Sequence, residues 1–135
     1  MGVLTGTLIV LGVAAVVGIS GAIVNYATED ERAQAEINRL KAENEQLTSA
    51  RDHVAGIKTK LTSAKDYLTG ARNDFNNGGH QQEPPFAQTQ FSSCISKLES
   101  ATQNATNLIN DFNATINQNN SDISKNQAIV NKHSN

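Results

Sequence analysis

The sequence predicts an all-α protein, in which an N-terminal transmembrane helix continues into a long antiparallel two-helix coiled-coil hairpin. Three observations predict this fold class. Residues 3–24 contain no charged side chain, apolar residues further along recur every seven positions, and one break, FNNGGHQQEPPF at 75–86, interrupts that pattern. A sustained heptad repeat is typical of packed helices with a left-handed supercoil. The predicted segments are an anchor at 1–28, a first coiled-coil arm at 29–76, a hairpin loop at 77–88 and a second arm at 89–132.

The uncharged segment has the length of a membrane span. About 22 residues at 1.5 Å per residue give a helix of about 33 Å, which matches the hydrocarbon thickness of a bilayer. Aromatic residues make up 4% of the chain and Trp is absent, so the polar remainder offers few large side chains to surround a buried apolar helix. We therefore expect a single-pass membrane protein in contact with membrane lipid.

Small residues recur every four positions within this segment, at Ala14, Gly18 and Ala22. This spacing lets helix backbones approach closely in lipid, so these three residues are the predicted packing face of the membrane helix. A cleaved signal peptide is the alternative, with a cut after Ala22, although no Lys or Arg precedes the apolar run. The side of the membrane that holds the hairpin stays open, because Arg32, Arg39 and Lys41 compete with the acidic residues 29–31.

The first arm carries an apolar residue every seven positions from Leu40 to Phe75. The second arm repeats this spacing from Ile95 to Val130. Two arms with one period around a glycine–proline turn predict a hairpin and not two domains. Antiparallel folding about residue 83 places large residues opposite small ones, such as Leu61 near Ala105, as close packing requires. The predicted hairpin seam comprises Leu47, Val54, Leu61, Leu68, Leu98, Ile109, Phe112 and Ile116.

Polar residues also occupy seam positions. Asn119 and Asn126 continue one heptad row of the second arm, and we expect them to fix the register by pairing with polar seam residues such as Asn44. A second sevenfold series consists of small residues: Ser49, Gly56, Ser63 and Gly70. Glycine costs a helix about 1 kcal/mol relative to alanine, so this series suggests close approach by a second copy or a partner helix, with ordinary surface tolerance as the alternative.

The sequence contains no motif of an enzyme. His53, His80 and His133 lie far apart without metal-ligand spacing, and no phosphate-binding loop or nucleophile motif is present. We therefore expect no catalytic residue, no cofactor, no metal and no small-molecule substrate. The net charge of −2 with dispersed basic residues argues against nucleic acid as a partner. The single cysteine, Cys94, excludes an intrachain disulfide.

These features favour a non-enzymatic, single-pass membrane protein whose hairpin is a structural or docking subunit of a larger membrane-associated assembly. A protein partner or a homo-oligomer is expected, with Phe86 at the hairpin tip as the predicted contact. Two alternatives remain. One is a secretion-linked hairpin, loosely similar in shape to the type VII hairpins but without their Trp-x-Gly turn. The other is a virion membrane component or a phage protein that looks like an inner-membrane spanin in its layout.

Overall fold

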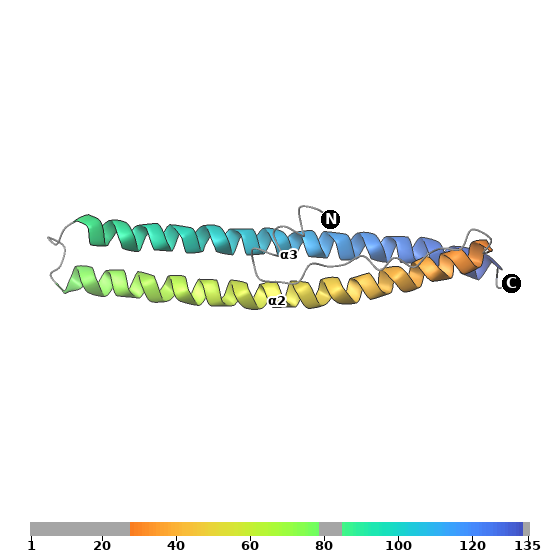
Figure 1. Ribbon diagram of the computed structural model, residues 1–135, viewed down its shortest axis with the longest axis horizontal. Helices are drawn as coiled ribbons and strands as arrows, with labels where there is room; N and C mark the ends of the chain where they lie inside the picture. The colour runs from red at the N-terminus through yellow and green to blue at the C-terminus, as the bar shows by residue number, and fades with distance from the viewer. Residues whose placement is uncertain (1–27, 79–84, 134–135) are drawn as a thin grey trace. The chain divides into compact units, whose positions relative to one another are not determined.

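The computed structural model describes residues 28–78 and 85–133, which form an α-helical hairpin (Figure 1). Its two long helices are α2 (Glu29–Asn77) and α3 (Pro85–His133). Neither of these helices is long and apolar enough to cross a membrane. The predicted anchor lies outside the described residues except for Thr28, so the transmembrane helix stays a prediction from the sequence.

Helix α2 begins with a capping box at Thr28 and Glu31. The backbone N–H of Glu31 donates to Thr28 Oγ1 at 3.4 Å, and the backbone N–H of Thr28 donates back to Glu31 Oε2 at 3.1 Å. These two bonds satisfy donors that a helix start otherwise leaves without partners. The first turn is acidic at Glu29, Asp30 and Glu31, which suits the positive end of the helix dipole.

The break in the heptad pattern separates the two helices. At the end of α2 the backbone N–H of Gly78 donates to the carbonyl of Asp74 at 2.9 Å. Helix α3 begins at Pro85, inside the segment predicted as loop, because a proline lacks only a donor that the first helical turn does not use. The loop between the helices is therefore shorter than the predicted 77–88.

The hairpin divides into two compact units, each built from a piece of both helices. The first, here called the terminal unit, contains the described residues 28–53 and 108–133. Its buried residues cluster along one face of each helix, as the 3.6-residue period of an amphipathic helix requires. They are Ala33, Ile37, Leu40, Leu47, Ala50, Leu108, Phe112 and the polar Asn119.

The second unit, here called the loop unit, contains the described residues 54–78 and 85–107. Only Val54, Ile95 and Ala105 are buried among its described apolar residues. Several other apolar residues of this unit are half-buried, and two of them form a tilted aromatic pair across the helices: the ring centroids of Phe75 and Phe91 lie 5.8 Å apart with an angle of 51° between the rings. This geometry is within the favourable range for aromatic pairs.

Polar pairs between the helices define the antiparallel register. In the terminal unit the guanidinium of Arg51 donates to Asn113 Oδ1 at 3.0 Å. In the loop unit Lys65 Nζ lies 3.4 Å from Glu99 Oε1, and the side-chain amide of Gln88 donates to Asn76. In each pair the two residue numbers average 82, whereas the heptad pattern predicted folding about residue 83.

Candidate functional site

The best-defined side-chain cluster of the hairpin is a polar layer in the terminal unit, formed by Glu43 and Asn44 of α2 and Asn119 and Asn120 of α3. Asn119 is only 6% exposed and is the one buried polar side chain among the described residues. Its amide donates to Asn44 Oδ1 at 2.9 Å and to Glu43 Oε1 at 3.3 Å. The amide of Asn44 in turn donates to Asn120 Oδ1 at 3.0 Å. The layer therefore joins the two helices through three hydrogen bonds.

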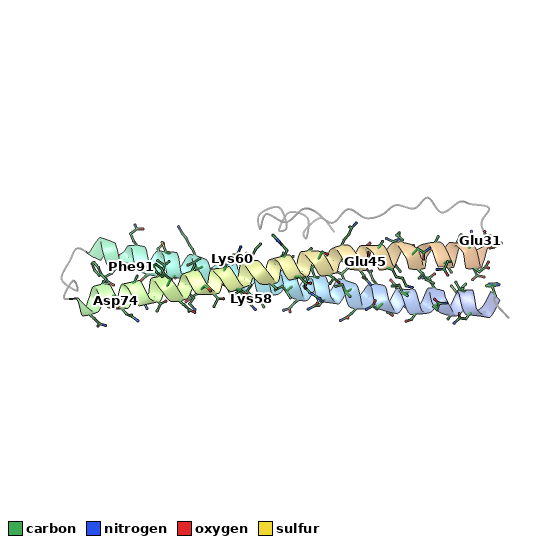
Figure 2. The ribbon with its side chains drawn as sticks, turned by 90° about the horizontal axis from the view of Figure 1, so that it is seen from below. Glu31, Glu45, Lys58, Lys60, Asp74 and Phe91 are labelled. Atoms are coloured by element: carbon green, nitrogen blue, oxygen red, sulfur yellow. The ribbon has the colours of Figure 1, made fainter. Side chains whose placement is uncertain are left out.

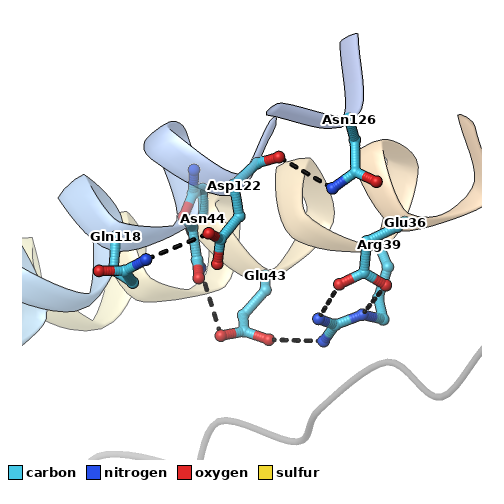
Figure 3. A network of polar contacts seen from close by, with 8 residues as sticks. Glu36, Arg39, Glu43, Asn44, Gln118, Asp122 and Asn126 are labelled. Carbon is cyan, nitrogen blue, oxygen red and sulfur yellow. Dashed lines mark hydrogen bonds and ion pairs between the residues drawn. The ribbon is translucent and has the colours of Figure 1, made fainter. Parts of the chain in front are cut away.

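An ion-pair chain holds the carboxylate of Glu43 in place (Figure 3). Arg39 lies between Glu36 and Glu43, at 2.5 Å and 3.2 Å respectively. The hydrogen bond from Arg39 lowers the pKa of the Glu36 carboxyl below its usual value. The same bond raises the pKa of Arg39. Both changes favour the charged forms of Glu36 and Arg39, and Arg39 in turn holds the Glu43 side chain beside Asn119.

The second seam asparagine behaves differently. Asn126 donates to the backbone carbonyl of Asp122, one turn back in its own helix, at 2.8 Å (Figure 3). The prediction that Asn119 pairs with Asn44 is confirmed, whereas Asn126 is bonded within its own helix. An asparagine at a seam position can bond either to the backbone carbonyl four residues earlier or to a side chain of the facing helix. Both choices are open to Asn119 and Asn126, so sequence position alone did not separate the two.

Local bonds of the same kind satisfy much of the polar surface. Glutamine side chains donate to an Asn or Asp four residues later at Gln34, Gln103, Gln118 and Gln127, over 3.0–3.1 Å. Several threonine hydroxyls donate to the carbonyl four residues earlier, as Thr102 does to Leu98 at 2.7 Å. No buried side-chain N or O among the described residues lacks a partner. The glutamine bonds are i,i+4 pairs of the kind that stabilise an α-helix, whereas the threonine bonds satisfy the hydroxyl without adding helix stability.

The arrangement supplies packing and register between the two helices. The pKa shifts at Asp30, Glu36 and Arg39 all favour the form already charged at neutral pH. Within the described ranges no group of acidic, His or Cys side chains is arranged to hold a metal ion. A shallow hollow on α3 is lined by one helix alone: Gln88, Thr89, Ser92, Ser93 and Ser96.

The predicted seam residues differ in burial. Leu47, Val54 and Phe112 are buried. The other five are half-buried: Leu61, Leu68, Leu98, Ile109 and Ile116. The small-residue series Ser49, Gly56, Ser63 and Gly70 is exposed, and an added Cβ at Gly56 or Gly70 would meet no atom within 4 Å. The hairpin itself therefore brings no helix against this series.

Some predicted positions fall outside what the structure describes. Ala14, Gly18 and Ala22 belong to the segment before Thr28, and the side chain of Phe86 is likewise outside the described set. Cys94 is exposed on α3.

Sequence reasoning also missed features that local signals carried. The capping box follows the Ser/Thr-x-x-Glu pattern at residues 28–31. Leu108 is buried, and it lies three residues after Ala105 and four before Phe112. Glu99 and Asn113, the cross-helix partners of Lys65 and Arg51, follow from the register, because the residue numbers of facing side chains share one average. The sequence also contains the N-glycosylation acceptor pattern Asn-x-Ser/Thr at 104–106, 113–115 and 119–121. The hairpin engages two of these acceptors, because Asn113 accepts a hydrogen bond from Arg51 and Asn119 is buried.

Comparison with known proteins assigns no family. No family model matches the chain, and no curated protein and no solved structure gives a significant match. The fold is a polar α-helical hairpin whose two helices are joined by hydrogen bonds around the buried Asn119.

Proposed function

We propose that this chain is a non-enzymatic structural or docking subunit, which residues 3–24 anchor in a membrane and whose hairpin contacts a protein partner. The observation that carries the proposal is the asparagine layer around Asn119. A buried amide is retained at a cost in stability where a unique pairing matters, and register is the best-attested use of such a group. A docking element needs that uniqueness, because its contact residues must stand at fixed positions.

The sequence supports the membrane part of the proposal. The described helices are polar on their outer faces, whereas residues 3–24 carry no charge. An Arg at the centre of a membrane helix costs about 3 kcal/mol of insertion free energy, which corresponds to a loss of about 100-fold. An Arg on an exposed face of α2 carries no such cost.

The anchor is tested by a matched pair of variants, Ala15→Arg and Ala35→Arg. Ala35 is exposed on α2, so its substitution controls for added charge. We expect only Ala15→Arg to lose carbonate-resistant membrane association, with the unaltered chain retaining its intact N-terminal mass in the membrane fraction. Equal behaviour of the two variants contradicts the anchor. A mass that begins after Ala22 in a soluble fraction supports the secretion-linked hairpin instead.

The docking part is tested at the predicted tip contact, Phe86. A photoreactive phenylalanine analogue placed at position 86 is compared with the same analogue at Thr59, which is exposed on α2. We expect one discrete crosslinked partner from position 86 and none from position 59. The same yield from both positions removes the tip from the proposal. A partner identified as a lipoprotein of the outer envelope favours the spanin-like alternative.

A further inference from the structure

The outward face of α2 in the loop unit carries a charged, an aromatic and a charged residue at intervals of seven: Lys60, Tyr67 and Asp74. Residues seven apart lie on nearly the same side of an α-helix. All three are exposed, and Tyr67, at 78%, is a large hydrophobic side chain left in water. Lys60 and Asp74 are both marked along α2 in Figure 2.

The hairpin does not account for the two charges. Among the described residues, neither Lys60 nor Asp74 forms an ion pair. The helical neighbours of Lys60, three and four residues away, are Ile57, Gly56, Ser63 and Ala64, none of which is acidic. The interhelical charge pair of this unit uses other residues, since Lys65 and Glu99 form it. The charges at both ends of the face are therefore available to another molecule.

We infer that this face binds the same face of a second copy of the chain, with the two α2 segments antiparallel about a two-fold axis at Tyr67. In that arrangement Lys60 of each copy lies opposite Asp74 of the other, so the two-fold symmetry forms the charge pair twice. The charges select this direction, because parallel pairing would place Lys60 beside Lys60 and Asp74 beside Asp74.

The residues on either side of Tyr67 are small. The same symmetry places Ala64 of one copy opposite Gly70 of the other, and both positions are exposed in the single hairpin. At Gly70 an added Cβ would meet nothing within 4 Å, so the packing of the hairpin does not require glycine there. These small residues on either side leave room for two tyrosine side chains between helix axes about 10 Å apart, the long end of the usual range. Tyr67 would stack beside its symmetry mate at the centre, where aromatic residues are enriched in interfaces.

The contact is small and therefore weak. Residues 60–74 extend over about 22 Å of helix, which covers much less than the roughly 800 Å² per partner of a standard interface. We therefore choose a test that traps a short-lived contact. The inference does not rest on the proposed membrane function, because residues of α2 alone carry it.

The test is disulfide trapping in the full chain, with Cys94→Ser as the background so that position 67 holds the sole thiol. Tyr67→Cys is compared with Ala55→Cys, an exposed alanine of the same helix on a different side. After mild oxidation we expect at least about ten times more disulfide-linked dimer from Tyr67→Cys, since cysteines on the axis come within the roughly 7 Å Cα separation that a disulfide tolerates. Equal yields from the two positions overturn the inference. The same result is expected if a different protein or a lipid surface covers the face.

Charge reversal tests the direction of pairing. Within the Tyr67→Cys background, Lys60→Glu and Asp74→Lys are each expected to reduce the dimer yield severalfold, because each creates two like-charge contacts. The double variant restores opposite charges and is expected to recover the yield. Circular dichroism of each variant verifies that helical content is unchanged. A double variant that traps no better than either single one refutes the antiparallel arrangement.

Discussion

Replacement of Asn119 by alanine is the most direct test of the polar layer. The change removes two donated hydrogen bonds, at 2.9 Å to Asn44 and at 3.3 Å to Glu43. A neutral hydrogen bond contributes about 1 kcal/mol net. The bond to Glu43 is longer and partly solvated, so it contributes about the same, and the two bonds together account for a loss of about 2 kcal/mol. Alanine is a better helix former than asparagine by about 0.6 kcal/mol, which offsets part of that loss. The expected net decrease in the free energy of unfolding is about 1.4 kcal/mol.

The matched control is Asn126→Ala. Asn126 occupies the next position of the same heptad row but donates to its own helix. Its substitution gains the same helix propensity of about 0.6 kcal/mol and loses only the bond within its own helix, so we expect the free energy of unfolding to stay within about 0.5 kcal/mol of the unaltered chain. The measurement is urea unfolding followed by circular dichroism, with both variants and the parent at one protein concentration.

Asn119→Leu separates stability from register. An apolar side chain of similar size removes the need for partners, so the helix pair is expected to be as stable as the parent or more so. Register is read independently by a disulfide between cysteines at positions 51 and 113, which face each other in the parent. Equal losses from Asn119→Ala and Asn126→Ala, or a 51–113 disulfide that forms equally well in Asn119→Leu, would refute the assigned role.

Three further outcomes follow from burial, charge and local geometry. Phe112→Ala should lower the free energy of unfolding by about 3–5 kcal/mol, because Phe112 is fully buried. Leu61 is half-buried, so Leu61→Ala should lower it by about 1–2 kcal/mol. Urea unfolding measures both losses, and similar values would contradict the difference in burial. The pKa of Glu36 is lower in the folded chain than its ordinary value of 4.5, so its pairing with Arg39 stabilises the fold above about pH 4.5 and is lost as the pH falls through the folded pKa. Glu36→Gln should therefore flatten the acid side of the stability profile, and an unchanged slope would count against the pair. Gly56→Ala should raise the thermal midpoint through a gain of up to about 1 kcal/mol, since the new Cβ meets nothing within 4 Å, and a decrease would show that another molecule packs there.

The sequence alone determined the hairpin and placed the midpoint of its two helices within one residue of position 82. Heptad rows from Leu40 to Phe75 and from Ile95 to Val130 define one apolar face on each helix, and two such faces must cover each other to leave water. The break at 75–86 fixes where the chain reverses, and antiparallel helices of one period then share a single midpoint. The pairing of Asn119 with Asn44 was also predicted, because both are polar residues at seam positions.

The tertiary structure alone decided how deeply each seam position is covered. The periodic pattern assigns Leu61 and Val54 the same status, yet Val54 is buried and Leu61 is half-buried. Coverage depends on the volumes of the facing side chains, and a periodic pattern records only their polarity. For the same reason the pattern did not separate Asn126 from Asn119. A side chain chooses between its own helix and the neighbouring one by distance and direction, and those quantities exist only after the two helices have packed.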